Sequence, residues 1–312
     1  MYIWAWGHSL LLIGLAWAAK PLPPVNLDDY QTAYQGEIDS SVWPHGNLNL
    51  GQVSGVDTDT AGNVHIFHRG SRAWTSRFYM PHGMTVDGKD NVWVTDVALH
   101  QVMKFAAGSD KPSLVLGERF KQGSDGEHFC QPTAVAICDT TGQIFVSDGY
   151  CNSRIVKFSS DGKYMLEWGS SNSYSSIPHS PGEFFIPHSL TLIMDWDLLC
   201  VADRENERIQ CFSAGTDPRG LPAGTFIKKA EQLGRVFAVD NAGHILVGVT
   251  NPGLGGGEPQ LFMVDLETGG SSVATPGLAN PHDLAIDVSK DGVMKAIYVA
   301  EIGPNTVRKI EL

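Results

Sequence analysis

Three histidines in this chain stand directly after a proline and directly before an apolar segment: His82, His188 and His282. Their spacings of 106 and 94 residues are too long for a local metal motif, whose ligands usually lie within a few residues of one another. If a repeated fold brings equivalent positions together, the three imidazoles would form the His₃ set of a zinc site with one open position for water or substrate. The alternative is that all three are structural histidines at strand starts.

Two further side chains suit acid–base or charge-stabilising chemistry. Tyr150 lies in the loop sequence DGYCN, where a phenol could act as a base if a metal or an arginine lowered its pKa. Arg69 follows an apolar strand in the sequence IFHRG, and its planar guanidinium suits a carboxylate or a developing oxyanion. Taken singly, a loop tyrosine and a strand-end arginine are more often structural.

The elements that must position these residues form an internal repeat. Its pattern is an apolar strand, a turn with Asp, Gly or Asn, and a second apolar strand that often ends in Asp. The six units begin at Gly55, Gly83, Thr133, Ser189, Gly234 and Asp283. Three to four short strands per unit without helical periodicity are typical of a β-propeller blade. The sequence therefore predicts an all-β, six-bladed β-propeller over residues 51–312, whose innermost strands converge on one channel.

The first blade is predicted to be abbreviated. The first two units start 28 residues apart, whereas the other intervals are 45 to 56 residues. A four-stranded blade needs about 40 to 50 residues, so the outer strands of the first blade are expected to be missing after Trp74. A pair of β-sandwiches with accidental similarity is the alternative fold.

Composition limits the partners and the domain count. The 312 residues are 42% hydrophobic and 18% charged, which is enough to bury a large core, and 34 Gly and 17 Pro favour many turns. The net charge of -12 and the lack of a basic run exclude a nucleic-acid partner. We expect a single domain, no membrane span beyond the N-terminal segment, and a monomer.

Residues 1–19 are predicted to be a secretory signal peptide. They contain no charged side chain, and an apolar run over 10–16 is followed by the cleavage pattern A-W-A. Retention as a membrane anchor is the alternative, although the apolar run is short for a span of about 20 residues. Residues 20–50 are interpreted as a lead-in segment. The secretory granule lumen or the extracellular space is the expected location.

An oxidising compartment would allow disulfides among the five cysteines. Cys200 and Cys211 flank a predicted hairpin, so a cross-strand disulfide is plausible. Cys130 and Cys151 border loops and form the natural second pair. Cys138 lies in an apolar strand and is expected to be a buried free thiol. The alternative is five unpaired cysteines in a cytosolic protein.

The chain resembles the peptidyl-α-hydroxyglycine α-amidating lyases, whose catalytic core is a six-bladed propeller of the NHL type. The matching segments include MPHG (80–83), NVWVTDVALHQVMKF (91–105), FVSDGYCNSRIVKF (145–158), IPHSL (186–190), LCVADRENERIQCF (199–212) and NPHDLAI (280–286). The family usually has a longer segment between the positions of Trp74 and Met80, the same place where the repeat spacing falls short.

The resemblance implies a zinc-dependent lyase that converts a peptide ending in α-hydroxyglycine to a peptide amide and glyoxylate, the second step of C-terminal amidation. It implies zinc on His82, His188 and His282, Tyr150 as base and Arg69 on the substrate. It also implies a structural calcium held by the Asp283 carboxylate and the backbone carbonyls of Val56 and Met84. The implied disulfides are Cys130 with Cys151 and Cys200 with Cys211, and the substrate would come from a separate copper monooxygenase.

Two other functions remain open at this point. A non-enzymatic NHL propeller that binds a peptide or protein would not need three equivalent channel histidines. A calcium-dependent hydrolase of the lactonase type would line its channel with Asn, Asp and Glu. Metal analysis would distinguish zinc, calcium alone and no metal.

Overall fold

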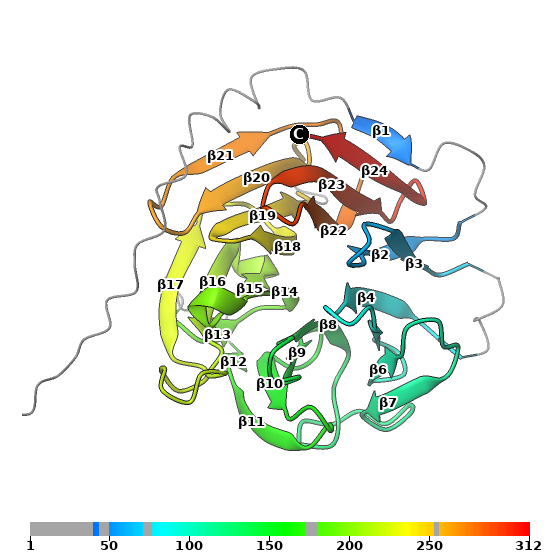
Figure 1. Cartoon of the computed structure of the whole chain (residues 1–312), viewed down its shortest axis with the longest axis vertical. Helices are drawn as coiled ribbons and strands as arrows, with labels where there is room; N and C mark the ends of the chain where they lie inside the picture. Colours follow the sequence, from blue (N-terminus) through cyan, green and yellow to red (C-terminus); the bar gives the residue numbers. More distant parts are fainter. Residues whose placement is uncertain (1–39, 44–49, 71–76, 172–179, 253–255) are drawn as a thin grey trace, which may run out of the picture.

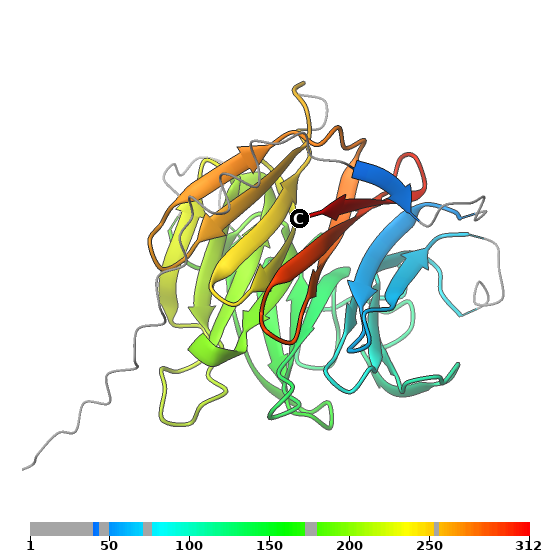
Figure 2. The same cartoon turned by 45° about the horizontal axis from the view of Figure 1, so that its top comes forward.

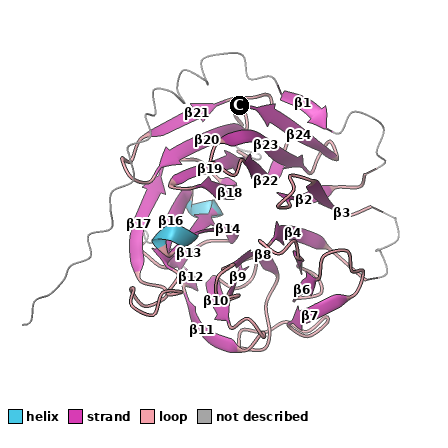
Figure 3. Cartoon of the chain, viewed as in Figure 1, coloured by secondary structure: helices cyan, strands magenta, loops and turns pink. Residues whose placement is uncertain are grey.

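The computed structural model describes residues 40–43, 50–70, 77–171, 180–252 and 256–312. The predicted signal peptide 1–19, most of the lead-in segment 20–50 and Trp74 lie outside these ranges. In the described part of the chain, strands and turns make up nearly all of the structure (Figure 3). The helices there are two 3₁₀ turns, η1 (Met194–Trp196) and η2 (Arg204–Asn206), and neither is long or apolar enough to cross a membrane.

Counted over the described residues, five antiparallel sheets of four strands radiate from one central axis (Figure 1). The first contains β4 (Pro81–Val86), β5 (Val92–Asp96), β6 (Gln101–Phe105) and β7 (Pro112–Leu116). The second contains β8 (Pro132–Ile137), β9 (Ile144–Asp148), β10 (Arg154–Phe158) and β11 (Tyr164–Trp168). The third contains β14 (Pro187–Ile193), β15 (Leu198–Asp203), β16 (Arg208–Ser213) and β17 (Phe226–Glu231).

The fourth sheet contains β18 (Val236–Ala242), β19 (Ile245–Thr250), β20 (Gln260–Asp265) and β21 (Ser271–Ala274). The fifth contains β22 (Pro281–Val288), β23 (Met294–Glu301), β24 (Thr306–Glu311) and β1 (Ser40–Trp43). The predicted repeat units coincide with the strands that line the axis, so the all-β propeller class is confirmed.

The two ends of the described chain meet in the fifth sheet. β1 pairs antiparallel with β24, from Ser40 opposite Ile310 to Trp43 opposite Val307 (Figure 2). The lead-in segment therefore supplies the outer strand of the last sheet, which the repeat pattern alone did not predict. This pairing closes the ring and covers an edge that would otherwise be free.

The first repeat unit is a sheet of two strands, β2 (Val53–Thr58) and β3 (Val64–His68), between β22 and β4 (Figure 1). Phe78 packs beside it, with its ring centroid 5.1 Å from that of Phe67 and 6.0 Å from that of Phe105. Phe78 belongs to a buried cluster with residues of β4, β5 and β6. One side chain of the connecting segment thus fills apolar space next to the short sheet. A second two-stranded pair, β12 (Ser170–Ser171) with β13 (Glu183–Phe184), is parallel.

The acidic residue at the end of the repeat's second strand has a structural role. Asp148 accepts a hydrogen bond from Arg154 at 3.1 Å, and Asp203 accepts one from Arg208 at 2.8 Å. Glu301 and Arg308 repeat the contact at 3.2 Å. Each pair joins the second strand of a sheet to the third and neutralises a buried charge, which explains the recurrent Asp and Arg. Apolar clusters between neighbouring sheets supply the rest of the core.

Candidate functional site

The three predicted zinc ligands lie at one end of the central channel. His82, His188 and His282 are the second residues of β4, β14 and β22, which alternate around the axis with β8, β18 and β2. In each of the three strands the pairing register shifts around the histidine. A β-bulge bends the strand and redirects the side chain at this position. The bulges therefore accompany the convergence of three side chains that are about a hundred residues apart.

The nitrogen atoms of the cluster are arranged for metal binding. Each Nδ1 lies within hydrogen-bond distance of a backbone carbonyl on the next inner strand: 2.8 Å from Thr133 for His82, 2.6 Å from Phe237 for His188 and 2.9 Å from Ser54 for His282. A carbonyl can only accept, so Nδ1 carries the proton and Nε2 has a free lone pair. One possible ligand atom from each histidine lies within 4.8 Å of the others. The residues therefore fit a His₃ metal site.

All three imidazoles are buried and held in the neutral form. Burial lowers the pKa of His282 to about 4. Burial also lowers the pKa of His82 and of His188 well below the usual value, and the neighbouring histidines add to this. Because only a neutral imidazole can bind a metal, protons would compete weakly for this site at neutral pH.

Tyr150 lies within this histidine cluster. Its hydroxyl oxygen is 2.9 Å from Nε2 of His82 and 3.2 Å from Nε2 of His188. Burial raises the pKa of the phenol, while the positive charges of Arg204 and Arg69 oppose that increase. Without a metal, the phenol is therefore protonated, and its one O–H donates to Nε2 of either His82 or His188. The sequence prediction grouped Tyr150 with the three histidines, and the structure brings the four together.

Arg204 is a site residue that the sequence analysis missed. Its guanidinium carbon lies 5.5 Å from the ring centroid of Tyr150 and 4.9 Å from that of Phe237. Glu205 accepts hydrogen bonds from Arg204 at 2.7 Å and from Arg235 at 2.9 Å, so one carboxylate holds both arginines. A signal was available: Arg204 and Tyr150 both follow the acidic end of a repeat's second strand, in neighbouring units.

Arg69 lies at the rim of the same end of the channel. Its Nε donates to the Pro81 carbonyl at 2.9 Å, next to His82, and it also bonds Gln52 at 3.2 Å. Its charge contributes to the lowered pKa of His82 and His282. The structure thus places Arg69 where its charge acts on the cluster.

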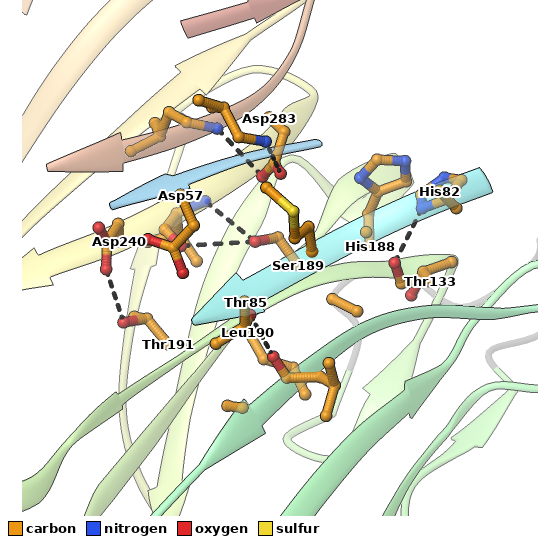
Figure 4. A pocket seen from close by; sticks show the side chains of 18 of the residues that line it. Asp57, His82, Thr85, Thr133, His188, Ser189, Leu190, Thr191, Asp240 and Asp283 are labelled. Atoms are coloured by element: carbon orange, nitrogen blue, oxygen red, sulfur yellow. Dashed lines mark hydrogen bonds between the residues drawn. The ribbon is translucent and has the colours of Figure 1, made fainter. Parts of the chain in front are cut away.

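A channel cavity of about 200 Å³ continues from the histidines to a group of carboxylates (Figure 4). Asp283 accepts backbone hydrogen bonds from Val56 at 3.2 Å and from Leu284 at 3.0 Å, and Met84 also lines this cavity. Asp57 and Asp240 face it as well, and the sequence analysis overlooked both. Burial raises the pKa of Asp57 to about 8, and the nearby Asp240 contributes. Burial also raises the pKa of Asp283. A cation would relieve this repulsion, which fits the predicted calcium.

The disulfide predictions are confirmed. Cys130 pairs with Cys151, next to Tyr150, and Cys200 pairs with Cys211 directly across β15 and β16. Cys138 is free and buried, as predicted. The first disulfide ties the loop that carries Tyr150 to the segment before β8.

Comparisons with known proteins give a matching family model and several similar chains. A family model described as the NHL repeat matches residues 129–158. The chain is 39% identical to a probable peptidyl-alpha-hydroxyglycine alpha-amidating lyase of Caenorhabditis elegans, with 95% of each chain covered. It is 42% identical to peptidyl-glycine alpha-amidating monooxygenase A of Xenopus laevis, covering 86% of this chain and 32% of that protein. The chain therefore spans about a third of the Xenopus relative.

That alignment is longer than the part of the present chain that it includes. It runs over 316 positions although it includes only 86% of the present chain, so the Xenopus protein carries residues that this chain lacks. Among solved structures, a catalytically inactive virginiamycin B lyase from Staphylococcus aureus with quinupristin matches with a TM-score of 0.52 and 14% identity. That match covers 88% of this chain and 100% of the other, and it shows a shared fold only.

Proposed function

Because this chain belongs to the peptidyl-α-hydroxyglycine α-amidating lyase family and is a lyase, we propose that it cleaves peptides ending in α-hydroxyglycine to a peptide amide and glyoxylate. In this reaction the bond between the amide nitrogen and the hydroxyl-bearing carbon breaks. The hydroxyl loses its proton as its oxygen becomes the aldehyde oxygen of glyoxylate, and the nitrogen gains one proton. The observation that carries the proposal is the convergence of three buried histidines in one cluster, with the Tyr150 hydroxyl within hydrogen-bond distance of Nε2 of two of them, His82 and His188.

The three histidines would hold a zinc ion through Nε2. Neutral imidazoles whose Nδ1 is fixed by a carbonyl are typical zinc ligands, and three of them leave a position open. When bound, zinc would supply positive charge that lowers the pKa of a nearby hydroxyl. Strands that carry a histidine alternate with strands whose carbonyls accept a hydrogen bond from Nδ1. This alternation supports the assignment, because it orients all three rings in the same way.

Tyr150 would accept the proton of the substrate hydroxyl. Its burial opposes ionisation, and the charges of Arg204 and Arg69 favour it. The same phenol would then return the proton to the departing amide nitrogen, so no proton is gained or lost overall. No covalent bond between enzyme and substrate is needed.

Two arginines would stabilise the negative charges of the substrate carboxylate and of the oxygen on which charge develops during the reaction. The substrate carboxylate is a suitable partner for the Arg69 guanidinium at the channel rim. Arg204 lies over the Tyr150 ring, where its charge would stabilise the phenolate and the developing negative charge on oxygen. Glu205 and Arg235 keep that guanidinium in place, so it needs little reorganisation during the reaction.

A calcium ion is proposed for the carboxylate end of the channel. Asp283 and the backbone carbonyls of Val56 and Met84 would bind it, since hard oxygen ligands suit calcium. Asp57 and Asp240 would add negative charge around it. We count the β2–β3 sheet as an abbreviated sixth blade. Because the three ligand residues come from β2, β4 and β22, the calcium would join this blade to both of its neighbours.

The biological setting follows from the same proposal. The substrate would be supplied by a separate copper monooxygenase, and the reaction would take place in secretory granules or outside the cell. Both disulfides are compatible with an oxidising compartment.

The proposed reaction is tested with the purified protein and a synthetic peptidyl-α-hydroxyglycine. The expected products, identified by mass spectrometry, are the peptide amide and glyoxylate in equal amounts. If the peptide is recovered unchanged at the rate of the protein-free control, the proposed function is wrong.

A further inference from the structure

The space beside the short β2–β3 sheet is a second cavity, of about 660 Å³. It lies between β3 and the first four-stranded sheet, and its walls are largely apolar, with Ile66, Phe67, Phe78, Met84, Val94 and Phe105. Arg69 and Pro81 lie at one end, and Ala106 and residues 108–110 contribute at the other. We call this cavity the β3 slot. Its volume falls in the range of sites that bind ligands of drug or short-peptide size.

One wall of the β3 slot is the edge of β3 that faces away from β2. In the described residues β3 pairs only with β2. The hairpin closes with a hydrogen bond from the amide of Asp59 to the carbonyl of Asn63, and the register pairs Asp57 with His65 and Val56 with Ile66. Hydrogen-bonded and non-hydrogen-bonded pairs alternate in antiparallel sheets, so Ile66 directs its N–H and C=O away from β2. An extended peptide could pair with these groups.

We propose that the β3 slot binds the peptide portion of the substrate as an added strand beside β3. This inference rests on the proposed function and deepens it, because it names the part of the substrate that determines affinity. Arg69 connects the slot with the candidate active site, because it lines the slot and its Nε donates to the carbonyl of Pro81, next to His82. A substrate whose carboxylate reaches Arg69 has its upstream residues at the mouth of the slot.

The direction and length of the bound segment follow from β3. Since β3 ends just before Arg69, a peptide with its C-terminus at Arg69 would run parallel to β3. The strand has 5 residues, so about four or five substrate residues would find backbone partners or apolar contacts. Apolar side chains would be preferred, because the slot offers Phe67, Phe78 and Phe105.

Exposed aromatic side chains extend this surface at the rim. Tyr79 is 69% exposed and also lines the slot, and Phe120 is 55% exposed. Their ring centroids lie 5.4 Å apart. Exposed apolar groups beside a cavity are typical of binding surfaces. A substrate peptide accounts for them, since its residues would cross this rim on the way to the channel.

The test compares substrates of different length on the full chain. N-acetyl-α-hydroxyglycine and peptides with one, two, four and six apolar residues before α-hydroxyglycine are assayed for glyoxylate release. KM is expected to fall roughly tenfold or more up to four or five residues and then to level off, with kcat nearly constant, because the added contacts are uniform binding. A KM that does not depend on length would overturn the proposal.

A matched pair of variants tests the location. Ala106→Trp would fill the outer end of the β3 slot, whereas Ala107→Trp changes a neighbouring exposed residue that does not line it. Ala106→Trp is expected to raise the KM of the six-residue peptide roughly tenfold and leave that of N-acetyl-α-hydroxyglycine unchanged. Ala107→Trp should change neither. Equal effects of the two variants would contradict the assignment.

A direct binding measurement tests the slot proposal independently of the proposed reaction. The affinity of the six-residue peptide amide is measured by calorimetry for the wild type and for both variants. Binding that only Ala106→Trp weakens supports the slot even if no glyoxylate forms, in which case the proposed function alone fails. No binding to the wild type, or a dimer that Ala106→Trp disrupts in sedimentation experiments, would overturn the slot proposal.

Discussion

The hydroxyl oxygen of Tyr150 lies 2.9 Å from Nε2 of His82. Nδ1 of that histidine faces the carbonyl of Thr133, so Nε2 is the acceptor and the phenol is the donor. The lone pair that holds the tyrosine is therefore the lone pair that a metal would need. Metal binding and the position of the Tyr150 proton are consequently coupled in this site.

Replacing Tyr150 with Phe removes the proposed base and leaves the histidines intact. We expect kcat for glyoxylate release to fall roughly 10²- to 10⁴-fold. KM and bound zinc should change little, because the ring and all three Nε2 atoms remain. Steady-state kinetics and metal analysis check this together. Unaltered glyoxylate release by the zinc-loaded variant would exclude Tyr150 as the base.

Glu205 is predicted to act through Arg204. Glu205→Gln removes the charge that holds both Arg204 and Arg235, so we expect kcat to fall roughly 10- to 100-fold through loss of alignment. The control is Glu207→Gln, two residues along the same turn at an exposed position. Glu205→Asp should restore part of kcat. Equal kinetics for the Gln variants at 205 and 207 would show that the carboxylate of Glu205 has no positioning role.

The two disulfides are predicted to have different roles. Replacing both Cys200 and Cys211 with Ala should lower the free energy of unfolding by about 2–4 kcal/mol with little change in kcat, since this pair joins β15 to β16 in an apolar cluster and does not border the Tyr150 loop. Replacing Cys130 and Cys151 with Ser should also lower kcat, because it releases the loop next to Tyr150. Denaturant unfolding and kinetics are measured on both double variants. Identical kcat values would contradict this distinction.

In the metal-free protein, the pKa of His282 is predicted to be lowered and that of His128 to be raised. His282 should protonate only near pH 4, because burial lowers its pKa to about 4. The unfolded state then binds more protons than the folded state below about pH 6.5. The contribution of His282 to the free energy of unfolding is therefore fully present above about pH 6.5, and about 3 kcal/mol of it is lost as the pH falls towards 4.

The side chain of Asp125 raises the pKa of His128, so this histidine should titrate above 6.5 and serve as an internal reference. Its contribution to stability is present below its unfolded pKa and is lost as the pH rises through the raised value. Nuclear magnetic resonance of the ring nitrogens measures both groups in one titration. A His282 midpoint near 6.5 would show that the cluster is open to water.

Much of the site could be predicted because the repeat fixes which strands reach the axis. Once the repeat units are aligned, His82, His188 and His282 occupy the same position in alternate units, and their convergence follows from the propeller. The Cys200–Cys211 pair could be predicted from a local pattern, since the two residues lie opposite each other in a hairpin.

Other parts could not be predicted because residue types do not encode backbone partners. The carbonyls of Thr133, Phe237 and Ser54 orient the imidazoles, and any residue could provide them. The bulges at the histidines leave no clear pattern in the sequence. Arg204 is a different case, because its loop has the same place in its repeat unit as the loop of Tyr150. The contact between the two side chains forms between neighbouring blades, so neither repeat unit indicates it alone. The pairing of β1 with β24 joins segments that share no repeat signal.

The most direct test of the central claim is a zinc titration of the metal-free protein while glyoxylate release is measured. The account predicts that activity rises linearly and reaches its limit at one zinc per chain, and that His188→Ala neither binds this zinc nor gains activity. His128→Ala, at a histidine that lines neither the channel cavity nor the β3 slot, should behave like the wild type. Activity that is independent of zinc, or no activity at full zinc loading, would contradict a zinc-dependent lyase at this site.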